Sequence, residues 1–189
     1  QWTNEIAAMN VKVKELIPKR YKYKCKVIGD LMADVKLNSE ISLRNKKKYY
    51  IALLPGSKKA KLSVGIPFFL EVADYIAEKN KNINFIIPIA PTTNESEYLF
   101  FQSERNPIAK YYLSKIKKLK NLNGSPFDYV IETSKNTKIY LIKKHPCYEI
   151  LKECDLAITT VGANTAELAA ITLPMLVVLP TQHLNMMNA

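Results

Sequence analysis

A glycine, a hydroxyl and several lysines follow directly after an apolar run near residue 50. The run Tyr49–Leu54 is followed by Pro55-Gly56-Ser57-Lys58-Lys59-Ala60-Lys61. Glycine lets the backbone approach a ligand closely, Ser57 offers a hydroxyl, and the lysines supply positive charge. These are the parts of an anion site, although the second glycine and the Lys-Ser/Thr pair of a Walker loop are absent. An ordinary solvated turn is the alternative interpretation.

A second candidate segment comes later, where another apolar run ends in threonines. It reads Val161-Gly162-Ala163-Asn164-Thr165-Ala166-Glu167. Free amides at a helix start, without bulky side chains, suit a diphosphate. Glu167 could accept hydrogen bonds from a ribose diol. Alternatively, Glu167 only interacts favourably with the helix dipole.

A third segment, Leu179-Pro180-Thr181-Gln182-His183, groups an amide, an imidazole and a hydroxyl. His183 has no carboxylate near it in sequence to orient it as a base, so we expect Gln182 and His183 to make polar contacts with a ligand. No His/Cys ligand spacing, nucleophile elbow or dinucleotide glycine motif is present. We therefore expect no metal site and no cofactor.

The elements that must position these residues alternate between strand and helix. The pattern predicts strands over 49–54, 84–89, 129–132, 138–142, 156–160 and 175–179, and helices over 64–79, 104–120, 146–154 and 164–171. Most of these strands are apolar on both faces, which is typical of a parallel sheet covered by helices on both sides. The sequence predicts a doubly wound, Rossmann-like α/β fold with a mostly parallel sheet. In such a sheet, ligands bind beyond the carboxyl ends of the strands.

The predicted α/β domain occupies residues 46–189, and residues 1–45 are predicted to be an interdomain linker or edge segment. Within the latter, 5–16 reads as a helix and 24–28 as a strand. Because the chain begins at Gln1 and ends after a strand and loop with no closing helix, we expect a piece of a longer protein.

The composition describes a basic globular chain of 189 residues with a formal net charge of +11. Of its 28 basic residues, 25 are lysine and only 3 are arginine. Direct reading of bases depends on the bidentate arginine fork, so we expect no nucleic-acid partner. No apolar run reaches the roughly 18 residues of a spanning helix, and the three cysteines fit no disulfide framework. We expect a protein of the cytoplasm, or one peripheral to a membrane.

Together these segments resemble the donor-binding, C-terminal half of a GT-B glycosyltransferase, and lipid-A-disaccharide synthase in particular. The resemblance lies in Leu54-Pro55-Gly56-Ser57-Lys58, in Ile87-Pro88-Ile89-Ala90-Pro91 and in Gly162-Ala163-Asn164-Thr165-Ala166-Glu167. Gln182-His183 is similar to the related transferase that adds N-acetylglucosamine to a lipid-linked peptidoglycan precursor. The resemblance covers most of residues 24–189.

The resemblance implies a UDP-sugar donor, a hexosamine-type sugar and a lipid-linked or membrane-surface acceptor. It implies that Gly56, Ser57 and the amides from Gly162 to Thr165 face the diphosphate. It further implies that Glu167 binds the ribose and that Gln182 approaches the sugar. The catalytic base of this family lies in an N-terminal domain that this chain does not include, so no catalytic residue is assigned and the fragment alone is expected to be inactive.

Two alternatives stay open. A UDP-N-acetylglucosamine epimerase shares the two-domain architecture and would need its own carboxylates in the missing half. A noncatalytic domain would instead bind anionic lipid or nucleic acid through the lysine-rich helix predicted over 104–120. That helix could equally be a solvated face.

Overall fold

The computed structural model describes residues 3–29, 43, 48–123 and 126–183. The chain divides into two compact units, Gln1–Lys36 and Leu37–Ala189. The predicted segment 1–45 contains the first unit, and its residues 1–2, 30–42, 44 and 45 lie outside the described part.

The first unit is a small β-α-β arrangement. Strand β1 (Ile6–Ala8) pairs in parallel with β2 (Cys25–Val27), and helix α1 (Val11–Leu16) and a 3-10 helix (Lys19–Lys24) connect them. The strand predicted over 24–28 is confirmed, but the single helix predicted over 5–16 is wrong in its first half. The reason is Asn10, whose side chain accepts a hydrogen bond from the amide of Val13 at 3.0 Å and so starts a shorter helix.

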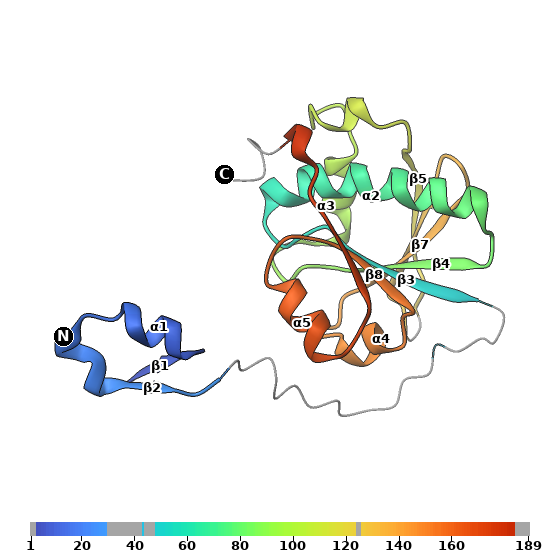
Figure 1. Cartoon of the computed structure of the whole chain (residues 1–189). Coiled ribbons are helices and arrows are strands. Elements are labelled where there is room, and N and C mark those ends of the chain that lie inside the picture. The colour runs from blue at the N-terminus through green and yellow to red at the C-terminus, as the bar shows by residue number, and fades with distance from the viewer. Residues whose placement is uncertain (1–2, 30–42, 44–47, 124–125, 184–189) are drawn as a thin grey trace. The chain divides into compact units, whose positions relative to one another are not determined.

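The second unit contains seven strands in one sheet. Along the chain its elements are β3 (Tyr49–Leu54), α2 (Lys59–Lys79), β4 (Ile83–Pro88), α3 (Glu95–Phe101), a 3-10 helix (Ala109–Tyr111), β5 (Ile116–Asn121), β6 (Tyr129–Thr133), β7 (Lys138–Ile142), α4 (Tyr148–Lys152), β8 (Leu156–Thr160), α5 (Asn164–Ala170), β9 (Met175–Val178) and a 3-10 helix (Thr181–His183). In Figure 1, α2 lies on one side of the sheet and α4 and α5 lie on the other.

The strand order is β5-β6-β7-β4-β3-β8-β9. The five strands from β7 to β9 are parallel, and β5 and β6 add an antiparallel extension beside β7. The chain runs from β3 through β4 to β7 on one side, then crosses to β8 and β9 on the other. This order is that of a doubly wound, Rossmann-like sheet, so the predicted fold class is confirmed.

Apolar side chains fill the space between the sheet and α2. Five residues of α2 at helical spacing are fully buried against the strands: Leu62, Ile66, Phe69, Leu70 and Ala73. Strand β3 is buried from its second residue to its last, as the run YYIALL predicts for a central parallel strand. This packing holds the ends of β3 and β4 in fixed positions relative to α2.

The helix predicted over 104–120 is wrong. The chain there forms bends, the short 3-10 helix Ala109–Tyr111 and then strand β5. Ile116 and Leu119 are three residues apart, as on one helix face, and both pack on the core. They do so because the pairing of β5 with β6 shifts register between Ile116 and Lys118, and this irregularity turns both side chains to the same face.

Proline 67 lies inside α2 and has no N–H to donate to the carbonyl of Ser63. Instead, Nδ2 of Asn106 donates to that carbonyl at 2.7 Å and also to the carbonyl of Phe101 at 2.5 Å. Asn106 is only 3% exposed. Its amide therefore satisfies a backbone group that Pro67 leaves without its helical partner.

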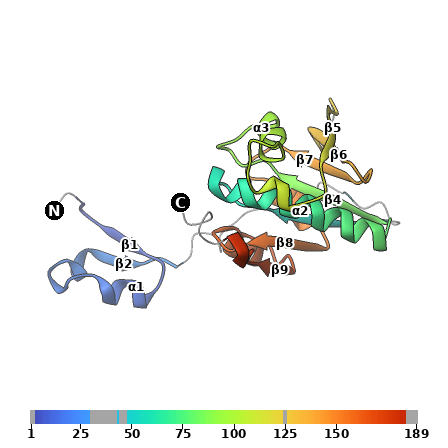
Figure 2. The ribbon, with the colours of Figure 1, turned by 90° about the horizontal axis from the view of Figure 1, so that it is seen from above.

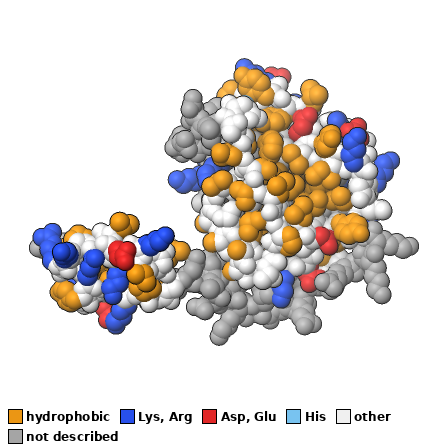
Figure 3. All heavy atoms as spheres, in the orientation of Figure 1, with side chains coloured by type: hydrophobic (Ala, Val, Ile, Leu, Met, Phe, Trp, Pro, Cys, Tyr) orange, Lys and Arg blue, Asp and Glu red, His pale blue; other side chains and the backbone are white. Residues whose placement is uncertain are grey.

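Strand β9 forms one edge of the sheet and lies nearest the viewer in Figure 1, as the view from above in Figure 2 makes clear. Apolar side chains gather on this face of the unit in Figure 3, and Leu176, Val177 and Leu179 are each about half exposed. Among the described residues, no helix is both long and apolar enough to cross a membrane.

Candidate functional site

The order of the strands reverses between β3 and β8, which lie side by side and end together. Leu54 at the end of β3 pairs with Thr159 near the end of β8. The loops that follow these two strands therefore leave the sheet at the same edge and diverge to opposite faces. This position is where doubly wound sheets bind their ligands.

A cavity of about 280 Å³ opens at this edge. Its walls come from residues 54–57 at the end of β3, 88–91 at the end of β4 and 145–148 at the start of α4, together with Leu151, Ala163, Asn164 and Glu167. The wall contributed by 88–91 is apolar and contains two prolines. Glu167 of α5 is the one acidic residue among the described residues that line the cavity.

Five of the ten predicted site residues line this cavity: Gly56, Ser57, Ala163, Asn164 and Glu167. Lys58, Gly162 and Thr165 belong to the same two loops but do not line it. Gln182 and His183 lie in the 3-10 helix after β9, where the His183 ring is 5.6 Å from that of Tyr111 and 6.1 Å from that of Tyr112. The structure thus brings the first two predicted segments together and leaves the third outside the cavity.

Two glycines set the loop after β3 against helix α2. Gly56 has a φ of +110°, and a Cβ on it would lie 2.9 Å from Cβ of Lys61. A Cβ on Gly65 would lie 2.7 Å from both Cβ and the carbonyl oxygen of Pro55. Sequence reasoning missed Gly65, although a glycine inside an amphipathic helix is itself a signal of close packing.

The lysines of this loop have different partners. Nζ of Lys61 donates to the carbonyl of Val161 at 2.9 Å, which joins the first turn of α2 to the loop after β8. Nζ of Lys59 forms an ion pair with Glu97 at 2.9 Å. Lys58 is exposed, and its ammonium group has no hydrogen bond or ion pair with any described residue. Of the three, only Lys58 has an ammonium group that is free to meet an anion.

A further contact joins the loops after β3 and β4. The hydroxyl of Thr92 donates to the carbonyl of Ser57 at 2.7 Å. The Ser57 loop is therefore tethered to the neighbouring loop by Thr92, while Lys61 connects α2 to the loop on the other side. These contacts hold residues 56 and 57 in the wall of the cavity.

Some of the groups near residues 162–165 that were predicted to bind a diphosphate are already hydrogen-bonded at the start of α5. The amide and the hydroxyl of Thr165 both donate to the carbonyl of Gly162, at 3.2 and 2.8 Å. The amide of Ala166 donates to the carbonyl of Ala163 at 3.0 Å. Because these groups close the turn, the amides of Thr165 and Ala166 are not free for a ligand.

Burial controls the ionisation of the cysteine and the tyrosine in the cavity wall. It raises the pKa of the Cys147 thiol from 9.0 to about 12, and the negative charges of Glu149 and Glu167 add to the effect. Burial and the nearby Glu167 carboxylate also raise the pKa of Tyr148. At neutral pH the cavity therefore presents a neutral thiol and a neutral phenol.

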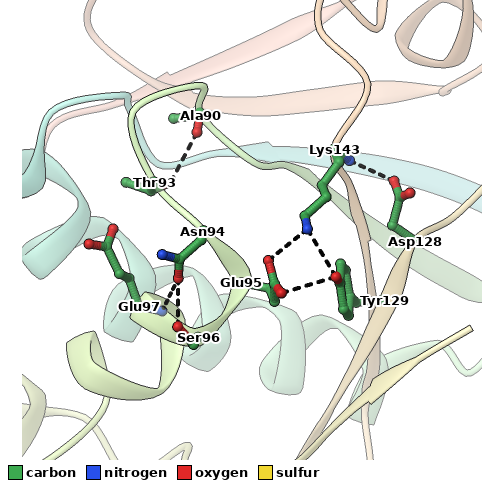
Figure 4. A network of polar contacts seen from close by, with 9 residues as sticks. All are labelled: Ala90, Thr93, Asn94, Glu95, Ser96, Glu97, Asp128, Tyr129 and Lys143. Carbon is green, nitrogen blue, oxygen red and sulfur yellow. Dashed lines mark hydrogen bonds and ion pairs between the residues drawn. The ribbon is translucent and has the colours of Figure 1, made fainter.

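A polar network that sequence reasoning missed lies at the same edge, at the ends of β4 and β7 (Figure 4). Tyr129 donates to Oε1 of Glu95 at 3.0 Å, while Nζ of Lys143 lies 3.1 Å from Oε2 of Glu95 and 3.0 Å from the Tyr129 hydroxyl. Oδ2 of Asp128 accepts from the amide of Lys143 at 2.7 Å.

The charges of this network stabilise one another. A backbone hydrogen bond and the ammonium of Lys143 lower the pKa of Glu95, while Tyr129 and Glu95 raise the pKa of Lys143. The network joins the start of α3 to the end of β7. Within the described ranges, no cluster of three or more His, Cys, Asp or Glu side chains could hold a metal ion.

The comparisons with known proteins show no family for this chain. No protein-family model matches the chain, and no curated protein matches it. Among solved structures, the chain is similar to trehalose-6-phosphate synthase OtsA, with 15% sequence identity and a TM-score of 0.38. This similarity covers 70% of the chain but only 29% of that synthase. A similarity this distant carries no argument about function.

Proposed function

We propose that the second unit is the donor-binding domain of a glycosyltransferase that uses a UDP-sugar. One observation carries the proposal: the two loops that resemble the donor loops of GT-B enzymes meet at the β3–β8 switch point and line one cavity. The carboxylate of Glu167 and the backbone of Gly56 and Ser57 are within this single site. The proposal extends to the reaction that the resemblance to lipid-A-disaccharide synthase implies, which is transfer of a hexosamine-type sugar to a lipid-linked acceptor.

The cavity size suggests which part of the donor lies inside. About 280 Å³ is close to the lower limit of about 300 Å³ for small-molecule sites. We therefore assign the nucleoside to the cavity, with its base against the apolar wall of residues 88–91 and its ribose hydroxyls donating to Glu167. The diphosphate then lies at the mouth, beside the backbone of Ser57 and the free ammonium of Lys58.

The chemistry assigned to these groups is stabilisation of the leaving group. An acceptor hydroxyl displaces UDP from the sugar carbon, and negative charge develops on the departing diphosphate. Lys58 and the backbone amides at residues 56 and 57 offer positive charge and hydrogen bonds to that diphosphate. No residue of this chain is assigned as the base that takes the acceptor proton.

The alternative based on a lysine-rich helix over 104–120 loses its premise, because that segment is not a helix. Four of its lysines instead lie on or next to the edge strand β5: Lys115, Lys117, Lys118 and Lys120. Lysines on an edge strand discourage pairing with other chains, which accounts for their placement without a ligand.

Isothermal titration of the 189-residue chain with UDP tests the proposal. Saturable binding that weakens about tenfold in Glu167→Gln is expected, because one charge-assisted hydrogen bond contributes about 1.5 kcal/mol. Glu104→Gln, which removes an exposed carboxylate elsewhere, should bind like the unmodified chain. No binding at millimolar UDP, or equal losses in the two variants, would overturn the assignment.

A further inference from the structure

A second and larger hollow lies at the amino ends of the strands, opposite to the ends where the proposed donor cavity lies. It is a groove of about 800 Å³ at the amino ends of β4 and β7, where α2 ends and the β6–β7 turn begins. Since β3, β4 and β7 are parallel, this edge is the one that the proposed donor site does not use. The groove is therefore separate from the proposed donor cavity and from the loops that line it.

Lysines from four places in the chain surround the groove. Lys48 precedes β3, Lys81 follows α2, Lys135 is in the β6–β7 turn and Lys138 begins β7. All four are exposed, and none of their ammonium groups has a hydrogen bond or ion pair with a described residue. Four unpaired ammonium groups around one hollow repel one another, so an anion among them would be stabilised.

The groove also contains a buried carboxylate with one unsatisfied oxygen. Asp74 of α2 is 1% exposed, and its Oδ1 accepts a hydrogen bond from the hydroxyl of Thr133 at 2.6 Å. Its Oδ2 has no partner. A buried acceptor without a donor is costly, because it has lost its hydrogen bonds to water. The side chain of Asn84, only 8% exposed, lies in the same wall and supplies a further donor and acceptor.

The charges of the groove limit the ligands that fit. Its four lysines, taken with Asp74 and Glu78, leave a net charge of +2. A simple cation would be repelled by the lysines, and a zwitterion would leave the excess positive charge uncompensated. A phosphate close to its dianionic form balances that charge, while neutral hydroxyl groups can donate to Asp74 and exchange hydrogen bonds with Asn84.

We propose that this groove binds a phosphorylated polyol, with a hydroxyl donating to Oδ2 of Asp74 and the phosphate among the lysines. The same phosphomonoester chemistry occurs in a free sugar or polyol phosphate and in the headgroup of a phosphorylated inositol lipid. The site goes beyond the donor-binding function and uses none of its residues, so either assignment can fail while the other holds.

Titration calorimetry of the full chain with inositol 1-phosphate tests the proposal, with inositol and inorganic phosphate as its separate parts. Inositol 1-phosphate is expected to bind at least about tenfold more tightly than either part. The double variant Lys135→Ala/Lys138→Ala should weaken binding by about tenfold or more. A charge-matched double variant outside the groove, Lys118→Ala/Lys152→Ala, should change it by less than about twofold.

Asp74→Asn tests the hydroxyl contact, because it keeps an acceptor for Thr133 but places a donor where the ligand hydroxyl would donate. It should weaken inositol 1-phosphate binding but not the binding of inorganic phosphate, which stays the same or becomes tighter because a negative charge has been removed from the groove. If this variant does not fold, as judged by thermal unfolding, the two lysine double variants still decide the question.

Vesicles distinguish the two sources of the ligand. Cosedimentation with vesicles that contain phosphatidylinositol 4-phosphate, but not with phosphatidylserine vesicles of matched charge, would support a lipid headgroup. Binding of inositol 1-phosphate alone would support a free polyol phosphate. The proposal is overturned if neither inositol 1-phosphate nor phosphatidylinositol 4-phosphate binds, if inorganic phosphate binds as tightly, or if both lysine double variants lose binding equally.

Discussion

Nζ of Lys61 lies 2.9 Å from the carbonyl oxygen of Val161 and donates a hydrogen bond to it, although the two residues are 100 positions apart in the sequence. Lys61 is in the first turn of α2, and Val161 is the residue after β8. A Cβ on the adjacent Gly162 would lie 3.6 Å from the same nitrogen. This single contact joins helix α2, which follows β3, to the loop after β8, at the point where the sheet reverses.

Lys61→Met removes this hydrogen bond and keeps most of the side-chain volume. We expect UDP affinity to fall by about fivefold, because the loop after β8 loses its attachment to α2, and stability to fall by about 1 kcal/mol. Titration calorimetry and urea unfolding measure the two effects. Lys152→Met, at an exposed lysine of α4, is the matched control. Equal affinities for the two variants would contradict a positioning role for Lys61.

Gly65→Ala tests the close approach of α2 to Pro55. In an open helix this change stabilises a protein by up to about 1 kcal/mol, because alanine has the higher helix propensity. Here the new Cβ would lie 2.7 Å from Pro55, so we expect a loss of about 1–3 kcal/mol and weaker UDP binding. The sign of the change in unfolding free energy shows whether the clash with Pro55 outweighs the gain in helix propensity. Increased stability would show that the loop does not pack on the helix as described.

Asn106 and Pro67 form a testable pair. Asn106→Ala leaves the carbonyl of Ser63 without a donor and should cost about 1–3 kcal/mol of stability. In a Pro67→Ala background, the restored N–H of residue 67 can bond to that carbonyl, so the same substitution should cost about 1 kcal/mol less. Chemical denaturation of the four proteins in a double-mutant cycle measures this coupling. Strict additivity would mean that Asn106 does not replace the missing N–H.

Two buried thiols flank helix α4, with Cys147 before it and Cys154 after it. They predict that the protein loses stability in mild alkali. Burial raises the pKa values of Cys147 and Cys154 from 9.0 to about 12. Above pH 9 the unfolded chain loses these protons while the folded chain keeps them, so unfolding becomes more favourable as pH rises towards 12. Stability should fall by up to about 1.4 kcal/mol per pH unit for each thiol.

Urea unfolding between pH 8 and 10 measures this slope before most tyrosines ionise. The double variant Cys147→Ala/Cys154→Ala should have a smaller dependence on pH over the same interval, whatever its absolute stability. A slope that is the same in the variant and the unmodified chain would contradict the assignment of the effect to these thiols.

The elements that were predicted correctly are those whose local sequence pattern matches their place in the tertiary structure. The run Tyr49–Leu54 is apolar throughout and becomes the central strand β3, and the helix predicted over 64–79 is the main part of α2. Where pattern and role disagree, the prediction failed. The three-residue spacing of Ile116 and Leu119 is typical of a helix. Here an irregular strand pairing instead turns both side chains to the same face of β5.

For the candidate site, residue types in the sequence indicated two of the loops but not the contacts that hold them. Nothing near Lys61 in sequence identifies Val161 as its partner, and nothing near Gly65 indicates that Pro55 lies against it. Gln182 and His183 follow a strand of the same sheet, yet they lie beside Tyr111 and Tyr112 rather than at the cavity. A ring contact of this kind depends on the path of residues 109–112, which the local pattern did not reveal.

The sequence by itself determined the alternation of strands and helices and the glycine-bearing loops after β3 and β8. It could do so because burial on both faces and freedom from a Cβ are properties of single residues and their near neighbours. Only the tertiary structure decided that these two loops share one cavity, that Lys58 alone among the loop lysines has no side-chain partner among the described residues, and that a lysine-lined groove with Asp74 lies at the amino ends of the strands. Those features depend on the order of strands in the sheet, which brings together residues that are far apart in the chain.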